Sequence, residues 1–214
     1  MLDITKSAEP KTLIEYRTQP DAQYDGPQFT PVKSEIREGL LQEQGHLCAY
    51  CMQRIKASKM KVEHWKSQSA CPSRQLDYTN MLGCCMGNEG KPHKQQTCDT
   101  HKGDLPLKYN PAQLSYAVQS KMRYKGDGRV DSTDTEFTQQ IESVLNLNQT
   151  RLVSNRVAVL DEIQQQLNKK TGQRTKSEIS LQIKQAQTLN GKGQLKPFSG
   201  LILNYLNKRL KKAD

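Results

Sequence analysis

The chain has 214 residues, only 34% of them hydrophobic, and a formal net charge of +10. That length allows one core, or one compact unit with a helical extension, but hardly two full domains. No apolar run approaches the roughly 20 residues that span a bilayer, and the charged first twenty residues do not resemble a signal peptide. We therefore expect a cytoplasmic protein rather than a membrane or secreted one.

The positive charge is concentrated towards the C-terminus. Residues 150–214 carry 13 Lys or Arg and 4 Asp or Glu, whereas residues 1–149 carry 19 and 18. A basic face of this kind attracts polyanions, and nucleic acid is the commonest such partner. The alternative is a well-solvated helical surface without a ligand.

Residues 1–47 are expected to form a helical N-terminal segment. Ser7 as a cap and Pro10 in the first turn predict a helix that continues through Tyr16. A loop rich in Pro and Gly then leads to a second helix, predicted from Ser34 to near Gly45.

Residues 48–110 form the central segment, which is irregular and rich in Cys, Gly, Pro and Lys. It has too few apolar residues for a core of its own. A metal is therefore expected to supply the stability that packing cannot.

Residues 111–214 are expected to form a hairpin and then helices. The hairpin would run from Ser120 to Val130, with Gly126 and Gly128 at turn positions that need positive φ. Apolar residues recur at helical spacing in four stretches, at 135–147, 152–167, 179–189 and 198–210. Four basic residues near the C-terminus are candidates for phosphate contacts, for helix-dipole stabilisation or for simple solvation, namely Lys208, Arg209, Lys211 and Lys212.

The six cysteines indicate a metal site. Zinc prefers four tetrahedral N or S ligands, and a Cys-x2-Cys turn lets two thiolates meet one ion. In an unsecreted chain, cysteines are more often reduced than paired in disulfides. We expect the zinc ligands to be Cys48, Cys51, Cys85 and Cys98, with Cys84 as the alternative to Cys85 and with Cys71 dispensable. The other interpretation is ordinary reduced thiols.

A zinc ion held by four thiolates has no open position, so catalysis would need other residues. We expect His64, at the edge of a short strand, to take a proton from water, and Glu63 to help bind a hard divalent cation. Asn80 can hold a loop across from His64 by hydrogen bonds to the backbone. Without the cysteines around it, Glu63-His64 would be better interpreted as an exposed charged pair beside a half-buried Trp65.

This order of residues resembles the HNH, or ββα-metal, nucleases. The resemblance implies that His64 is the general base, that Asn80 fixes the hairpin, and that Glu63 binds a catalytic Mg²⁺ or Mn²⁺ ion. The third position of the motif is Asp99 if the pattern Cys-polar-x-x-Lys is followed, and His101 if the family name is followed. Either side chain can reach a metal at the start of a helix, and Lys66 or Lys102 could position a neighbouring phosphate.

The likeness extends over most of the chain. It rests on segments that include Lys6-Ser-Ala-Glu-Pro10, Ile36-Arg-Glu-Gly-Leu-Leu41, Leu76-Asp-Tyr-Thr-Asn80 and Leu145-Asn-Leu-Asn148. These segments are similar to PtuB, the HNH subunit of Septu-type anti-phage systems, which also occurs beside some retrons. This resemblance implies a partner ATPase of the ABC type (PtuA-like) that controls cleavage and, in a retron, a reverse transcriptase and its DNA product.

The sequence therefore predicts a mainly α fold with a small zinc-stapled ββα-metal core between a helical N-terminal segment and a helical C-terminal region. The expected function is metal-dependent hydrolysis of phosphodiester bonds in DNA or RNA. The alternative is a non-enzymatic zinc-ribbon module that binds nucleic acid or a protein partner through its basic helical tail.

Overall fold

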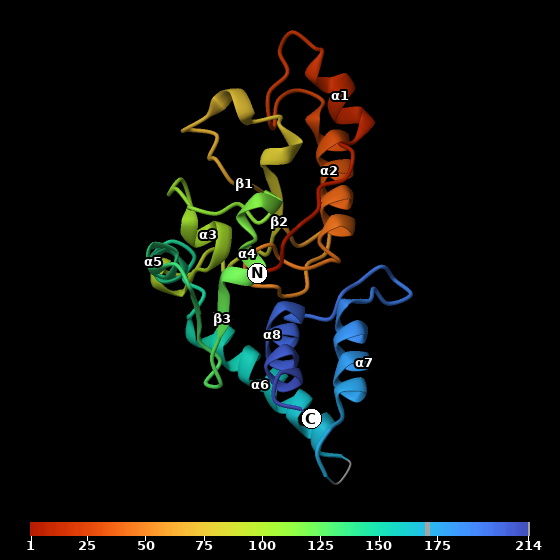
Figure 1. Cartoon of the computed structure of the whole chain (residues 1–214). Coiled ribbons are helices and arrows are strands. Elements are labelled where there is room, and N and C mark those ends of the chain that lie inside the picture. The colour runs from red at the N-terminus through yellow and green to blue at the C-terminus, as the bar shows by residue number, and fades with distance from the viewer. Residues whose placement is uncertain (170–171, 214) are drawn as a thin grey trace.

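Helices make up most of the regular secondary structure of the described residues, beside two small and separate two-stranded sheets (Figure 1), so the mainly α fold is confirmed. The structure is a computed structural model that describes residues 1–169 and 172–213. Its helices are α1 (Lys11–Arg17), α2 (Phe29–Glu43), α3 (Cys98–Lys102), α4 (Val118–Lys121), α5 (Thr135–Ser143), α6 (Thr150–Asn168), α7 (Lys176–Gln187) and α8 (Ser199–Leu210). Its strands are β1 (Lys61–His64), β2 (Met81–Cys84), β3 (Met122–Tyr124) and β4 (Val130–Ser132). None of the helices in the described residues has the length and apolar character needed to cross a bilayer.

The first two helices begin at other residues than the sequence predicts. Ser7 does not cap α1, because its backbone N–H and hydroxyl both donate to Glu43, at 2.9 and 2.8 Å. Helix α2 begins at Phe29 and includes Pro31, which is tolerated in a first turn where no N–H partner is required. The buried face of α2 follows helical spacing and consists of Phe29, Val32, Ile36, Leu40 and Leu41.

The first sheet pairs β1 and β2 in antiparallel register, with His64 opposite Met81 and Lys61 opposite Cys84. All four residues of β2 are buried, and the strand packs against α2. A long connection with two short 3₁₀ turns, Pro72–Arg74 and Tyr78–Asn80, joins the strands. The short helix α3 follows, so the central segment has the order strand, strand, helix.

The predicted hairpin forms between β3 and β4, but only one of its two glycines has the expected conformation. Gly128 has φ of +82°, whereas Gly126 does not take a positive φ. A Cβ atom on Gly128 would lie 2.6 Å from the carbonyl oxygen of Val153, so α6 also requires a glycine there.

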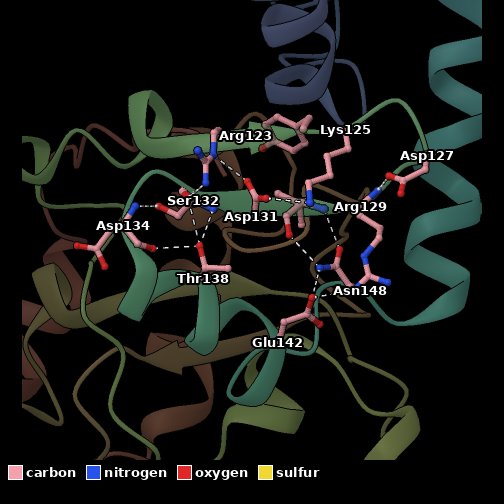
Figure 2. Close-up of polar contacts among 12 residues, drawn as sticks. Arg123, Lys125, Asp127, Arg129, Asp131, Ser132, Asp134, Thr138, Glu142 and Asn148 are labelled. Atoms are coloured by element: carbon pink, nitrogen blue, oxygen red, sulfur yellow. Dashed lines mark hydrogen bonds and ion pairs between the residues drawn. The ribbon is translucent and has the colours of Figure 1, made fainter.

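The side chain of Asn148 extends this second sheet (Figure 2). It accepts from the backbone N–H of Val130 and donates to the carbonyl of the same residue, each at 2.8 Å, as a neighbouring strand would. Glu142 accepts a further bond from Asn148 and pairs with Arg129. The hairpin is thereby fixed to the chain between α5 and α6.

The main hydrophobic core takes residues from all three of the expected segments, including Leu13, Ile36, Leu82, Ile141 and Leu152. The central segment contributes more to it than its composition suggests, because α2 and α5 bring apolar partners for its few hydrophobic side chains. Apart from Ala49 and the cysteines, nine of these are buried, namely Tyr50, Met52, Ile55, Met60, Leu76, Tyr78, Met81, Leu82 and Leu107. A second cluster lies among α6, α7 and α8.

Arg156 on α6 is 2% exposed and joins three separate segments. Its guanidinium donates to the carbonyls of Gly128 (2.5 Å) and Leu147 (2.7 Å) and to Oδ1 of Asn148 (3.3 Å). Without the guanidinium these acceptors would lose their donor, and an unsatisfied buried polar group is costly. Arg156 therefore connects the hairpin turn and the loop before α6 to the helix.

We expect Arg156→Ala to lower the free energy of unfolding by about 3 kcal/mol, because it removes a buried charged donor from three acceptors. Urea denaturation followed by circular dichroism measures this loss. Arg151→Ala is the matched control, since Arg151 is an exposed residue of the same helix with one bond to Asn88, and it should change stability by less than about 0.5 kcal/mol. Equal effects of the two substitutions would contradict the assignment.

Candidate functional site

Four thiols meet at one point in the structure. The sulfurs of Cys48, Cys51, Cys85 and Cys98, called the cysteine cluster below, lie within 4.8 Å of one another. The separation of Cys51 and Cys85 is 3.8 Å, and two sulfurs of a tetrahedral zinc site with Zn–S bonds of about 2.3 Å are about 3.8 Å apart. Cys84 is buried outside this cluster, and Cys71 is half-buried beside Ser73. The cysteine cluster is therefore compatible with a structural zinc ion.

Backbone turns bring the two halves of the cysteine cluster together. In the first half, the N–H of Met52 donates to the carbonyl of Cys48 at 3.0 Å, and Met52 has φ of +63°. In the second half, the N–H of Thr97 donates to the carbonyl of Gly87 at 2.9 Å. This bond closes the loop between Cys85 and Cys98, which explains how cysteines so far apart in sequence meet.

The chemistry of the cysteine cluster favours a cation. Burial alone would raise the pKa of the Cys48 thiol, but the surrounding sulfurs outweigh burial and lower it well below its usual value. The pKa values of Cys51 and Cys98 are raised instead, first by their contacts with Cys48. One thiolate is thus stabilised by neighbouring S–H groups. A second or third thiolate would be repelled by the negative charge of the first. A divalent cation removes this conflict.

Glu63 on β1 is a buried carboxylate, 3% exposed. The hydroxyl of Tyr50 donates to its Oε1 at 2.9 Å, and the ammonium of Lys102 on α3 lies 2.9 Å from the same oxygen. Burial raises the pKa of Glu63 well above its usual value; hydrogen bonding and charge repulsion from Asp99 add to this, and Lys102 opposes it. Glu63 and Asp99, called the carboxylate pair below, are therefore close neighbours.

Two nearby carboxylates offer the oxygen ligands that hard divalent cations prefer. Because Tyr50 and Lys102 both use Oε1 of Glu63, Oε2 is the oxygen left for Asp99 or a cation. Asp99 itself is half-buried and lies in the first turn of α3. The carboxylate pair thus has the right chemistry for Mg²⁺ or Mn²⁺.

His64 is the last residue of β1 and is 5% exposed. Its Nε2 lies 2.9 Å from the carbonyl oxygen of Gln75. A carbonyl can only accept, so Nε2 carries the proton and Nδ1 keeps its lone pair. Burial lowers the pKa of His64, which keeps the ring neutral near pH 7. The imidazole ring is therefore held in one orientation, with its proton on Nε2, and Nδ1 can accept a proton as a base does.

Asn80 holds the connection between the two strands. The residue is fully buried; its Oδ1 accepts from the N–H of Lys66 at 2.9 Å, and its Nδ2 donates to the carbonyls of Lys66 and Arg74 at 3.0 and 3.3 Å. Its own carbonyl accepts from the N–H of Trp65. The residues that follow His64 are thus fixed by one side chain.

Asp99 and His101, the two candidates for the third position, point to different surroundings. Asp99 interacts with Glu63. His101 stacks on His93 with ring centroids 4.0 Å apart, and its Nδ1 lies 2.9 Å from the carbonyl oxygen of Val144, at the end of α5. The contacts of His101 therefore connect α3 to neighbouring segments, while those of Asp99 belong to the carboxylate pair.

The candidate phosphate-binding residues differ in their exposure and in their distance from the site. Lys102 is 1% exposed and its ammonium is bonded to Glu63, so it has no open surface to offer a phosphate. Lys66 is exposed directly after Trp65. The four basic residues from Lys208 to Lys212 are exposed at the end of α8, which lies far from β1 and β2 in Figure 1.

Three residues of the site have no part in the sequence prediction. Tyr50 lies inside the Cys-x2-Cys turn, and this position within a metal-binding motif could have identified it from the sequence. Tyr24 packs edge-on against the His64 ring with centroids 4.5 Å apart. The Gln75 side chain accepts from the Tyr24 N–H at 3.0 Å, while its carbonyl accepts from His64. Tyr24 and Gln75 carry no motif, so only the fold identifies them.

The chain is similar to one known nuclease candidate over part of its length. It is 34% identical, over 90 residues or 41% of its length, to a protein of Vibrio cholerae serotype O1 biovar El Tor that is named as a candidate HNH endonuclease of retron Vc95. The matched residues span 42% of that protein. No family model matches the chain. The similarity is thus to a candidate HNH endonuclease and covers less than half of either protein.

Proposed function

We propose that the chain is a metal-dependent HNH endonuclease that hydrolyses phosphodiester bonds of nucleic acid. The observation that carries this proposal is the geometry of His64. Its Nε2 is engaged by the Gln75 carbonyl, its Nδ1 is left as a base, and it directly follows Glu63 of the carboxylate pair on β1. A non-enzymatic zinc ribbon has no need for a neutral, oriented histidine beside a buried glutamate and a half-buried aspartate.

The two metal sites have separate tasks in this proposal. The cysteine cluster would hold a structural zinc ion that joins the start of the central segment to β2 and α3. Glu63 and Asp99 would hold Mg²⁺ or Mn²⁺, which would stabilise negative charge on the phosphate and on the leaving 3′ oxygen. Carboxylates suit such hard ions, and thiolates suit zinc.

The protein residues have the following tasks. His64 takes a proton on Nδ1 from the attacking water, while Gln75 fixes the ring and keeps Nε2 protonated. Asn80 fixes the connection that follows His64. Tyr50 and Lys102 orient Glu63 through its Oε1. Lys66, which is exposed beside the site, is proposed to contact the phosphate backbone.

We further propose that the enzyme is the effector of an anti-phage defence complex controlled by an ABC-type ATPase. The retron name of the similar protein supports a defence setting. A reverse transcriptase with its DNA product is the additional partner in the retron form of such a system. The basic residues at the end of α8 are proposed to bind nucleic acid away from the cutting site.

The first test concerns zinc. Cys48→Ser and Cys98→Ser should each lose the bound zinc ion and lower the Tm by more than about 10 °C, because ligand binding is part of the folding free energy. Cys71→Ser, outside the cysteine cluster, should keep both zinc and Tm. Elemental analysis and calorimetry of the purified proteins measure these outcomes, and full zinc content in Cys98→Ser would rule out this ligand set.

The second test concerns His64. His64→Ala should lower cleavage by about 10²–10⁴-fold, since general base catalysis contributes about that much, and should retain zinc. Cleavage of plasmid, single-stranded DNA and tRNA is measured in the presence of Mn²⁺ or Mg²⁺, both with the chain alone and with its complex with the ATPase. His93→Ala is the matched control, because His93 is exposed and stacks on His101. Undiminished cleavage by a folded His64→Ala protein would refute the proposed function.

The third test separates Asp99 from His101. Asp99→Asn should lower cleavage by at least about 100-fold and raise the Mn²⁺ concentration needed, because it removes a charged ligand. His101→Gln should leave the Mn²⁺ requirement unchanged, because His101 bonds to Val144. Titration of Mn²⁺ at fixed substrate distinguishes the two, and the reverse pattern would assign the third position to His101.

A further inference from the structure

Arg37 on α2 is a half-buried cation without a counter-ion. Its Nε is buried without a hydrogen-bond partner, and the guanidinium forms no ion pair within residues 1–169 and 172–213. Lys33, one turn earlier on the same helix, pairs instead with both carboxylate oxygens of Asp25, at 2.7 and 2.9 Å. A buried donor without a partner is costly, so its retention points to a ligand.

The surroundings of Arg37 connect it to the candidate site. Residues three or four apart share one face of a helix, so Arg37 lies on the same face as Lys33, whose ammonium is 5.0 Å above the Tyr24 ring. The edge of that ring meets the His64 imidazole at 4.5 Å. Burial raises the pKa of Tyr24; the charges of Asp25 and Asp99 raise it further, and the charge of Arg37 lowers it.

Tyr24 is held in this position by the same residue that orients His64. Its N–H donates to the Gln75 side chain, and the Gln75 carbonyl accepts from His64. Phe29 packs on the other side of the Tyr24 ring at 4.8 Å. The loop before α2 is therefore a wall of the site beside His64, and α2, which carries Arg37, follows it directly.

We propose that Arg37 binds a phosphate of the nucleic-acid backbone next to the cleaved bond, so that the N-terminal segment completes the substrate site. This inference rests on the proposed function. A guanidinium can donate two parallel hydrogen bonds to a phosphate. Within the described residues the charge of Arg37 is not paired with a carboxylate, whereas that of Lys33 is paired with Asp25. The carboxylate pair repels a phosphate unless a cation and a basic group offset it, and Arg37 is a basic group without another partner.

Binding and cleavage are measured separately to test this role. A fluorescein-labelled oligonucleotide, single-stranded or duplex, is titrated with the full-length His64→Ala protein and with His64→Ala carrying Arg37→Ala, at KCl concentrations from 50 to 300 mM, in the presence of Mn²⁺. Arg37→Lys in the same background tests rescue by charge. Arg17→Ala is the matched control, because Arg17 is an arginine of the N-terminal segment whose guanidinium pairs with Glu9. Zinc content and Tm verify that each variant is folded.

Arg37→Ala should weaken binding by about tenfold at low salt and reduce the slope of log affinity against log salt by about one unit, as expected for one phosphate contact. Arg37→Lys should restore the slope but only part of the affinity, since lysine lacks the bidentate geometry. Arg17→Ala should change neither. A merely structural role would alter Tm and leave the salt slope unchanged.

Cleavage by the Arg37→Ala single variant should fall at least about tenfold through KM, with a smaller effect on kcat. Equal binding by His64→Ala with and without Arg37→Ala, whether strong or undetectable, would overturn the inference about Arg37. Full cleavage by His64→Ala would instead overturn the proposed function itself. The two failures are therefore distinguishable.

Discussion

The convergence of four thiols is the contact on which the candidate site depends. The cysteine cluster joins the turn after α2, the end of β2 and the start of α3. Each segment carries one part of the site close to its cysteine: Tyr50 lies inside the first turn, β2 is paired with the strand that carries Glu63 and His64, and Asp99 directly follows Cys98. Separating the thiols would therefore separate Asp99 on α3 from Glu63 and His64 on β1.

Charge is the second constraint. Glu63 is buried and Asp99 is half-buried; burial raises the pKa of Glu63 first, and the neighbouring Asp99 raises it further. Lys102, itself almost fully buried, offsets part of this repulsion through Oε1. When both acids are ionised, their charge exceeds that of the Lys102 ammonium, and a divalent cation is the natural complement. The negative charge of the two acids repels a phosphate, so a bound nucleic acid also needs basic groups beside this site.

The N-terminal segment forms one wall of the candidate site, beside His64. Tyr24, Phe29 and Arg37 precede the cysteines in sequence, yet the ring of Tyr24 covers His64 and is fixed through Gln75. The helices α6, α7 and α8 form a separate hydrophobic cluster at the other end of the molecule (Figure 1). The candidate site and the basic end of α8 thus lie far enough apart to contact different parts of a nucleic acid or different partners.

The sequence by itself predicts the helical fold, the β3–β4 hairpin and the candidate ligands, because helical spacing, turn glycines and Cys-x2-Cys are local patterns. It predicts helix starts less well: Ser7 bonds to Glu43 rather than capping α1, and Pro31 lies inside α2. It also cannot choose between Cys84 and Cys85, or between Asp99 and His101, because adjacent or near-adjacent residues differ only in the direction of their side chains. Tertiary structure decides those directions: Cys85 joins the other thiols, Asp99 meets Glu63, and His101 turns to Val144. Tyr24 and Gln75 come to the site only through long-range packing, which leaves no local pattern in the sequence.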